Sequence, residues 1–435
     1  MSNSLTELGF TKMSRPRVLK LVVLGLLLVS AAEFVVRGPA RYLQARSEWN
    51  DFSQNYTASK LWLRGKSPSN PKNFVALWKE QTYIGLDVSD IRTHLAPPLG
   101  GLVAMAPVAA LPWKIAKVIW LSVLLLSFAA TVWVFIGRLE ESWREKVIFV
   151  AACLAFAPFH TGIASGNTSI LVVGFCAVAI AAALESHDAI AGILFGFACS
   201  LKPQLGAFLV LYYLIQRRWR LFVAALGSTI ALNVIAVFYL SVRGTTWLQD
   251  YLSNARGFVT SNSIDSFASD NPARFALLNL QVPFFSLTHQ VNSANFWAFV
   301  VTGVLVSTWT LFVFKTKEKH EFVALAAIST ISLLPVYHRF YDAAILVIPL
   351  CWCLVELTRS SKPLALCGLF LLSPFFFPGT ALLGRLASHD GLHPSLTNSW
   401  IWESVVMPHE TWALLLLSAI LLYAVKETRV CSAKS

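Results

Sequence analysis

The sequence predicts an all-α polytopic membrane protein with about twelve transmembrane helices, and three observations lead to this fold class. First, 56% of the 435 residues are hydrophobic and only 13% are charged, whereas a soluble domain carries about 25% charged residues. Second, the charged residues are clustered, which leaves long apolar runs between them. Third, several runs reach the roughly 20 residues that a helix needs to cross the hydrocarbon core.

The first crossing is expected at residues 18–37. Its basic start and apolar run resemble a signal peptide, but the apolar run continues past Ser30 to Val36, so we expect an uncleaved helix. The further crossings are expected at 114–137, 146–164, 168–184, 189–201, 204–216, 220–241, 294–315, 322–337, 342–358, 364–378 and 411–426.

The distribution of Lys and Arg orients this single domain. With the N-terminus inside, the short basic segments fall on one side, as the positive-inside rule requires; they are 138–146, 217–220, 315–320, 359–362 and the tail from Lys426. Three longer segments then face outward: 38–94, 242–293 and 379–410. The formal net charge of +12 is therefore attributed to membrane topology and anionic lipid rather than to nucleic acid.

Two places depart from simple crossings. Residues 95–112 are apolar but contain several prolines, which predicts a re-entrant or broken helix surrounded by protein or a water-filled cavity. Residues 189–201 and 204–216 are short for full spans and could form a broken hairpin beside a cavity.

Asp51 follows the first crossing and opens a segment with helical periodicity. Phe52, Tyr56 and Leu61 would form an apolar face suited to a helix on the bilayer surface. Asp51 with Gln54 fits a helix N-cap, and that capping role competes with a second one. A carboxylate at the bilayer edge could instead act as a general base toward an attacking hydroxyl.

Polar residues that interrupt apolar sequence are the other candidates for chemistry. Lys202, His338 and Arg339 are ionisable groups flanked by apolar runs, and such groups usually face a cavity. They could bind an anion such as a phosphate, or Arg339 could simply pair with Asp342. His94 and Asn167 are expected on the same face.

The sequence predicts no cofactor, no metal site and no disulfide framework. Six of the seven cysteines lie in apolar runs, where cysteine acts as a small hydrophobe. The last outer segment contains His389, Asp390, His393 and His409, but their loose spacing favours a solvated loop over a metal site.

Several stretches in this order resemble one known family. They are "YTASKLWLRGKSP", "THLAPPLGGLVAMAPVAALP", "SGNTSILVVGF", "AGILFGFACSLKPQLGAFLVLYYLIQRRWR" and "LLPVYHRFYDAAIL". The pattern is similar to glycosyltransferase family 87 of the GT-C superfamily, which includes mycobacterial polyprenol-phosphate-mannose-dependent α-1,2-mannosyltransferases. The resemblance covers roughly residues 45 to 350.

The resemblance implies a GT-C-type fold and a membrane enzyme that uses a polyprenyl-phosphate-linked sugar, mannose above all. The acceptor would be a hydroxyl of a glycolipid or glycan, and the site would face the periplasm or outside of a bacterial plasma membrane. The resemblance makes Asp51 the catalytic base, places His338 in the active site and makes Lys202 a phosphate contact. Arg339, His94 and Asn167 are further candidates for binding substrate.

A secondary transporter or lipid flippase is the alternative reading. Such a protein also has broken helices and buried charges, but it places them at the middle of the membrane, usually between internal repeats. Here the polar candidates gather at one edge and no repeat is visible. The sequence therefore favours an enzyme.

Overall fold

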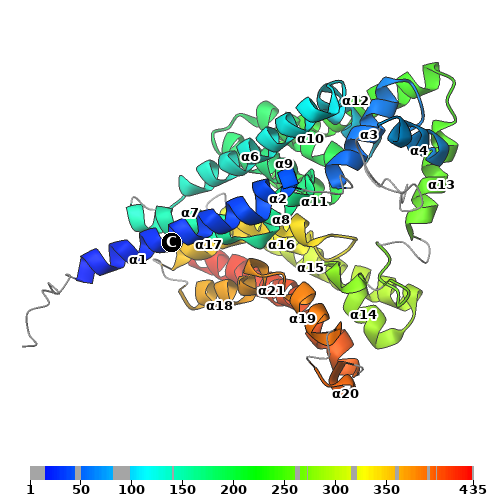
Figure 1. The fold of residues 1–435 in the computed structure, drawn as a ribbon. Helices are drawn as coiled ribbons and strands as arrows, with labels where there is room; N and C mark the ends of the chain where they lie inside the picture. The colour runs from blue at the N-terminus through cyan, green and yellow to red at the C-terminus, as the bar shows by residue number, and fades with distance from the viewer. Residues whose placement is uncertain are drawn as a thin grey trace, which may run out of the picture.

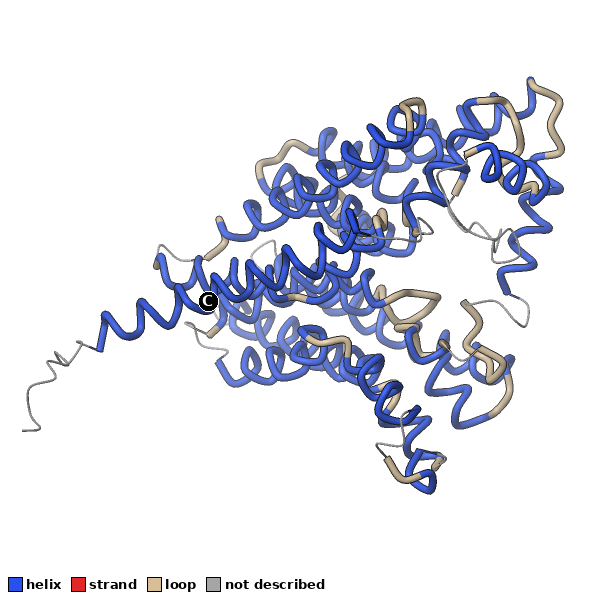
Figure 2. The backbone as a smooth tube through the Cα atoms, viewed as in Figure 1, coloured by secondary structure: helices blue, strands red, loops and turns tan. Residues whose placement is uncertain are grey.

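The chain folds into a bundle of helices (Figures 1 and 2). The computed structural model describes residues 15–44, 50–81, 98–139, 142–259, 265–271, 273–314, 321–357, 362–388, 392–397 and 399–433. Within these ranges every element longer than a single bridge is a helix. This outcome agrees with the predicted all-α class.

Five helices are long and apolar enough to cross a membrane. The first is residues 19–44, which comprise most of α1 (Arg15–Val35) together with η1 (Val36–Ala40) and α2 (Arg41–Gln44). The other four are α6 (Trp113–Ile136), α12 (Trp219–Val242), α15 (Val291–Phe314) and residues 409–427 of α21 (His409–Ala433). All five coincide with predicted crossings. Continuous helix through Ser30 also fits the expected first span.

Two further spans are bent. Helices α7 (Trp143–Ala155) and α8 (Ala157–Ser165) meet at 45°, and residues 362–376 meet 379–387 at 53°. The second pair comprises α18 (Lys362–Leu372), η6 (Ser373–Phe376) and α19 (Gly379–Ser388). Counting each pair as one span gives seven candidates at most among the described residues.

The other predicted crossings are short apolar helices, so twelve full spans are not reached by length. These helices are α9 (Ser169–Leu184), α10 (Asp188–Leu201), α11 (Pro203–Ile215) and α16 (Glu321–Ile331), with α17 (Val347–Glu356) following the 3₁₀ helix η5 (Phe340–Leu346). The segment 95–112, predicted to be re-entrant or broken, contains the short apolar helix α5 (Leu99–Ala109). Pro107 lies inside α5, and Lys202 separates α10 from α11. The sequence correctly located the break at Lys202, whereas α5 is continuous through Pro107 and ends at Ala109.

The elements of the three predicted outer segments gather toward one end of the molecule, on the right in Figure 1. They are α3 (Asp51–Leu63), α4 (Pro71–Glu80), α13 (Trp247–Val259), η3 (Arg274–Ala276), α14 (Gln281–Thr288), α20 (Pro394–Thr397) and η7 (Trp402–Val406). Helix α7, which follows the basic segment 138–146, begins at the opposite end. Which of these two ends faces outward stays a prediction.

Helix α3 does not turn its apolar face to lipid, and that prediction was wrong. Its apolar face is covered by protein, because Phe52 and Tyr56 are fully buried and Leu61 is 1% exposed. The Phe52 ring stacks on Trp113 and Trp120 of α6. Burying such aromatic surface stabilises the protein more than interfacial contact would, so α3 is fixed to α6.

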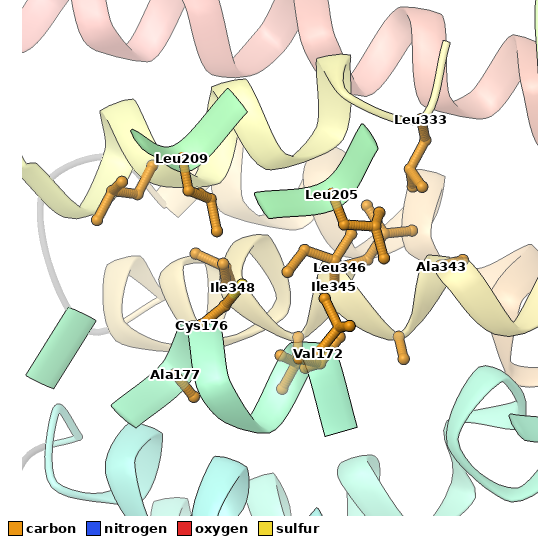
Figure 3. Close-up of a cluster of buried hydrophobic side chains, with 14 of the residues drawn as sticks. Val172, Cys176, Ala177, Leu205, Leu209, Leu333, Ala343, Ile345, Leu346 and Ile348 are labelled. Atoms are coloured by element: carbon orange, nitrogen blue, oxygen red, sulfur yellow. The ribbon is translucent and has the colours of Figure 1, made fainter. Parts of the chain in front are cut away.

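The short helices form the core of the bundle. Figure 3 shows Val172 and Cys176 of α9 facing Leu205 and Leu209 of α11, with Ile345 and Ile348 between them. All six are 0–1% exposed. The described buried cysteines belong to this packing and form no disulfide. The core therefore lies directly behind the segments that carry Asn167 and Lys202.

Helices α10 and α12 approach closely through a Gly-x-x-x-Gly pattern. A Cβ atom at Gly192 would lie 2.3 Å from the Leu221 carbonyl oxygen, and one at Gly196 would lie 2.2 Å from the Ser228 Oγ. Small residues at this spacing let two helix backbones pack directly in a membrane. Ser228 and Thr229 hydrogen-bond to nearby carbonyl groups at the same contact.

We therefore expect Gly192→Ala to destabilise the protein. The added methyl group would push against backbone, and overpacking of this kind costs about 1–3 kcal/mol. Thermal unfolding in detergent would measure the loss, with Gly227→Ala on α12 as the control, since a Cβ there meets no atom within 4 Å. An equal melting temperature for both variants would contradict the close packing of α10 on α12.

Candidate active site

Four segments that are distant in sequence meet near the outer end of the bundle. Asp51 begins α3, Asn167 follows α8, Lys202 lies between α10 and α11, and residues 337–342 lead into η5. A chain of hydrogen bonds runs from Asp51 through Asn167 and Ser169 to Asp342. The predicted convergence of these polar residues is thus present in the structure.

Asp51 does not cap its helix, which corrects one of the two sequence interpretations. The N-cap is Asn50, whose side chain accepts a hydrogen bond from the Ser53 backbone N–H at 2.9 Å. Ser53 completes the capping box, because its Oγ accepts from the Asn50 N–H at 3.0 Å. The helix ends at Leu63, and Gly65 follows with φ of +66°, a conformation that favours glycine after a helix. The Asp51 carboxylate is consequently available for another role.

Asn167 holds the Asp51 carboxylate. Its Nδ2 donates to Asp51 Oδ2 at 2.8 Å, and its Oδ1 accepts from the Ser169 backbone N–H at 2.8 Å. Gly166 precedes it in the left-handed region with φ of +67°, and a Cβ there would lie 2.7 Å from Phe52 Cβ. Only glycine suits both requirements. The turn after α8 therefore sets the position of Asp51.

Burial raises the pKa of Asp51 above its usual value. The hydrogen bond from Asn167 lowers that pKa, as do the positive charges of Lys202 and Arg339, but these effects are smaller than the loss of hydration. The side chain nevertheless keeps some exposed surface. A carboxylate of raised pKa that can still be reached has the properties of a general base.

Asp342 is the centre of the buried part of the site. Its side chain is 0% exposed. The Oδ1 atom accepts a hydrogen bond from Lys202 Nζ at 2.5 Å and another from the Ser169 hydroxyl. Its Oδ2 accepts the Arg339 backbone N–H at 3.1 Å. Lys202 also lies 4.9 Å from the centre of the Tyr341 ring. A buried charge is tolerated only when it is paired in this way.

His338 lies behind Asp342. Its ring is 0% exposed, with Nδ1 3.2 Å from Asp342 Oδ2 and Nε2 3.0 Å from the Ser332 carbonyl oxygen. Both ring nitrogens are therefore occupied by oxygen atoms of the protein. This geometry suits a residue that positions Asp342 better than one that contacts substrate.

Arg339 pairs with an acid from an outer segment. Its guanidinium donates to Asp265 Oδ1 at 2.8 Å and to the Tyr337 hydroxyl at 3.1 Å. Of the two alternatives for Arg339, side-chain pairing with Asp342 is not observed, because Lys202 pairs with that carboxylate. An isolated bridge between Leu277 and Arg339 ties the same outer segment to the site.

The sequence missed Asp265, Ser169 and Tyr341 as site residues. Asp265 lies far from any motif, and only its place in an outward segment was a clue. Ser169 lies two residues after Asn167, and Tyr341 lies three residues after His338. A helical or turn spacing of two or three residues was the only signal that could have identified these two.

The remaining candidates fall outside this cluster. His94, His389 and Asp390 lie outside the described residues. His393 Nδ1 lies 2.8 Å from Ser395 Oγ, and His409 Nδ1 lies 2.9 Å from the Val406 carbonyl oxygen. In the described part of the chain no group of three or more His, Cys, Asp or Glu side chains is arranged to hold a metal ion.

One comparison with known proteins gives a match. The model of glycosyltransferase family 87 matches residues 97–337, which include Asn167, Ser169 and Lys202 and end just before His338. Asp51 lies ahead of the matched region. No curated protein and no solved structure matches the chain.

We expect Asp342→Asn to destabilise the protein strongly. The change leaves Lys202 without its buried counter-charge, and breaking one partner of a buried ion pair costs about 3–5 kcal/mol. Glu80→Gln is the matched control, because Glu80 pairs with Arg64 at 2.7 Å on the surface, where such pairs contribute little. Denaturant unfolding would compare them, and equal stabilities would exclude Asp342 as the centre of the cluster.

Proposed function

We propose, since the chain belongs to glycosyltransferase family 87, that it transfers a hexose from a polyprenyl-phosphate-linked donor to a hydroxyl group of a glycolipid or glycan. Mannose is the proposed sugar, and Asp51 is the proposed general base. The observation that carries this proposal is the Asp51 carboxylate itself. It is free of capping, held by Asn167, and close enough to Lys202 and Arg339 for their charges to act on its pKa.

The first half of the proposed reaction is activation of the acceptor. Asp51 would accept the proton of the acceptor hydroxyl while that oxygen forms a bond to the anomeric carbon of the donor. Its partly desolvated carboxylate is a stronger base than a fully hydrated one. The hydrogen bond from Asn167 occupies Oδ2, which orients the carboxylate for this step.

The second half is departure of the lipid phosphate. The bond between the anomeric carbon and the phosphate oxygen breaks with its electron pair, so the polyprenyl phosphate leaves as an anion. Attack from the opposite face would invert the configuration at the anomeric carbon. Lys202, with a side chain 13% exposed, and Arg339, at 18%, are the cations proposed to stabilise this charge.

Asp342, Asp265 and His338 are proposed as positioning residues. Each acid fixes one of the two cations, at 2.5 Å for Lys202 and 2.8 Å for Arg339. Cations already held in place lose little conformational entropy when the phosphate arrives. In this proposal the site faces the periplasm or outside of a bacterial plasma membrane, where the outer segments lie.

We expect Asp51→Asn to reduce sugar transfer by at least about 100-fold, the lower range for loss of a general base. The amide keeps the shape of the side chain but cannot accept the proton. Purified, lipid-reconstituted protein would be assayed with a panel of radiolabelled polyprenyl-phosphate sugars and membrane extract as acceptor.

Glu185→Gln is the control for this experiment, because Glu185 is an exposed acid that follows α9, at the opposite end of that helix from Asn167. Labelled product from the wild type and the control, with none from Asp51→Asn, would support the class and identify the donor. Equal transfer by Asp51→Asn would remove Asp51 as the base. No transfer from any donor in the panel would contradict the proposed substrate.

We expect Asn167→Ala to move the acidic limb of the pH–rate profile to higher pH. The hydrogen bond from Asn167 lowers the pKa of Asp51, so its loss raises that pKa further. Because the base must be ionised, the rate then falls at a higher pH than in the wild type. Transfer measured against pH would test this, with Asn73→Ala on α4 as the control, and an unchanged limb would contradict it.

A further inference from the structure

A group of basic side chains surrounds the outer end of the first span. This basic collar consists of Arg37 and Arg41 at the end of that span, Lys60 of α3, and Lys114 and Lys117 of α6.

Specific contacts hold the collar together. The Tyr42 hydroxyl donates to the Lys117 carbonyl oxygen at 3.2 Å, and Lys117 Nζ lies 5.8 Å from the centre of the Tyr42 ring. Lys60 Nζ donates to the Tyr56 hydroxyl at 2.6 Å, and that hydroxyl donates to the Leu111 carbonyl oxygen at 2.8 Å. These contacts hold α2 and α3 against the start of α6 and the turn before it.

Exposed aliphatic side chains adjoin these cations. Val36 is 66% exposed and Leu43 54%, while Ile115 is 50% and Val118 57% exposed. They lie on the same two span candidates that carry Arg37, Arg41, Lys114 and Lys117. Aliphatic surface beside cations is typical of the boundary between hydrocarbon and headgroups.

The basic collar lies at the end of the bundle where the positive-inside rule does not predict basic residues. Arg217 and Arg218 lie between α11 and α12, and Arg220 lies in the first turn of α12, at the other end of those helices from Lys202 and α13. The positive-inside rule accounts for basic residues at that end but not for the collar. Within residues 15–44 and 98–136 the one acid is Glu33, which pairs with Arg37 at 3.1 Å.

We propose that the basic collar binds the phosphate groups of anionic phospholipids in the outer surface of the bilayer. The cations match that charge, and the aliphatic side chains place them at headgroup depth. The collar also contacts the active site, because the Tyr42 ring lies against Gly166, which precedes Asn167. Binding of headgroups fixes the depth of Asp51 in the membrane. This inference does not depend on the identity of the sugar or the acceptor.

Retention of lipid by the purified protein tests the proposal. Wild type, Arg41→Gln/Lys114→Gln, and the control Lys72→Gln/Lys79→Gln would each be incubated in neutral detergent with equal amounts of phosphatidylglycerol and phosphatidylcholine. Bound lipid would be counted by native mass spectrometry. Both variants lose two exposed charges, but Lys72 and Lys79 lie on α4, away from the spans.

The wild type and the control should retain phosphatidylglycerol preferentially, and the collar variant should lose this preference by on the order of tenfold. Equal retention by the two double variants, or no preference in the wild type, would overturn the proposal. Selective displacement of phosphatidylglycerol by polyprenyl phosphate would also overturn it, because the collar would then be a donor site. None of these outcomes requires sugar transfer, so the result is independent of the proposed function.

Discussion

The buried carboxylate of Asp342 is the constraint on which the site depends. A charge removed from water must be compensated by opposite charge and hydrogen bonds. Lys202, His338, Ser169 and the Arg339 N–H supply them from three different parts of the chain. Because each partner lies at a break between helices, compensation of this one charge fixes how those helices meet.

The breaks in turn explain the division between long and short helices. The long spans contribute most of the exposed apolar surface, for example Leu28 at 70%, Phe238 at 67% and Leu311 at 62%. The short helices α9, α11 and α16 are enclosed by them and form the core in Figure 3. Irregular backbone is tolerated at membrane depth where protein surrounds it. The interior can therefore carry polar turns, while the lipid-facing helices remain continuous.

The sequence predicted these features unequally, for physical reasons. Long apolar runs have a single interpretation, so the five long spans were found at the correct positions. The break at Lys202 was also visible, because a buried charge followed by proline interrupts apolar sequence. The predicted number of twelve spans is not confirmed by helix length, because hydropathy does not distinguish a long spanning helix from a short buried one.

Within the site, local pattern was not sufficient to assign partners. Asn50 and Asp51 are both good N-cap residues, and only the fold shows that Asn50 caps α3. The apolar face of α3 has the same periodicity whether lipid or protein covers it. Arg339 and Asp342 are close in sequence, yet Asp265 is the acid that reaches the guanidinium. Long-range pairing of this kind leaves no periodic signal.

The three acids of the site have different surroundings, and these surroundings favour different roles. Asp342 and Asp265 each bind a cation directly, with side chains 0% and 8% exposed. Asp51 instead accepts a neutral amide hydrogen bond from Asn167, and burial raises its pKa. The hydrogen bond from Asn167 lowers the pKa of Asp51 less than burial raises it, so this carboxylate has a raised affinity for a proton. These surroundings are the reason that Asp51 is proposed as the base, and that Asp342 and Asp265 are proposed to hold Lys202 and Arg339 in place.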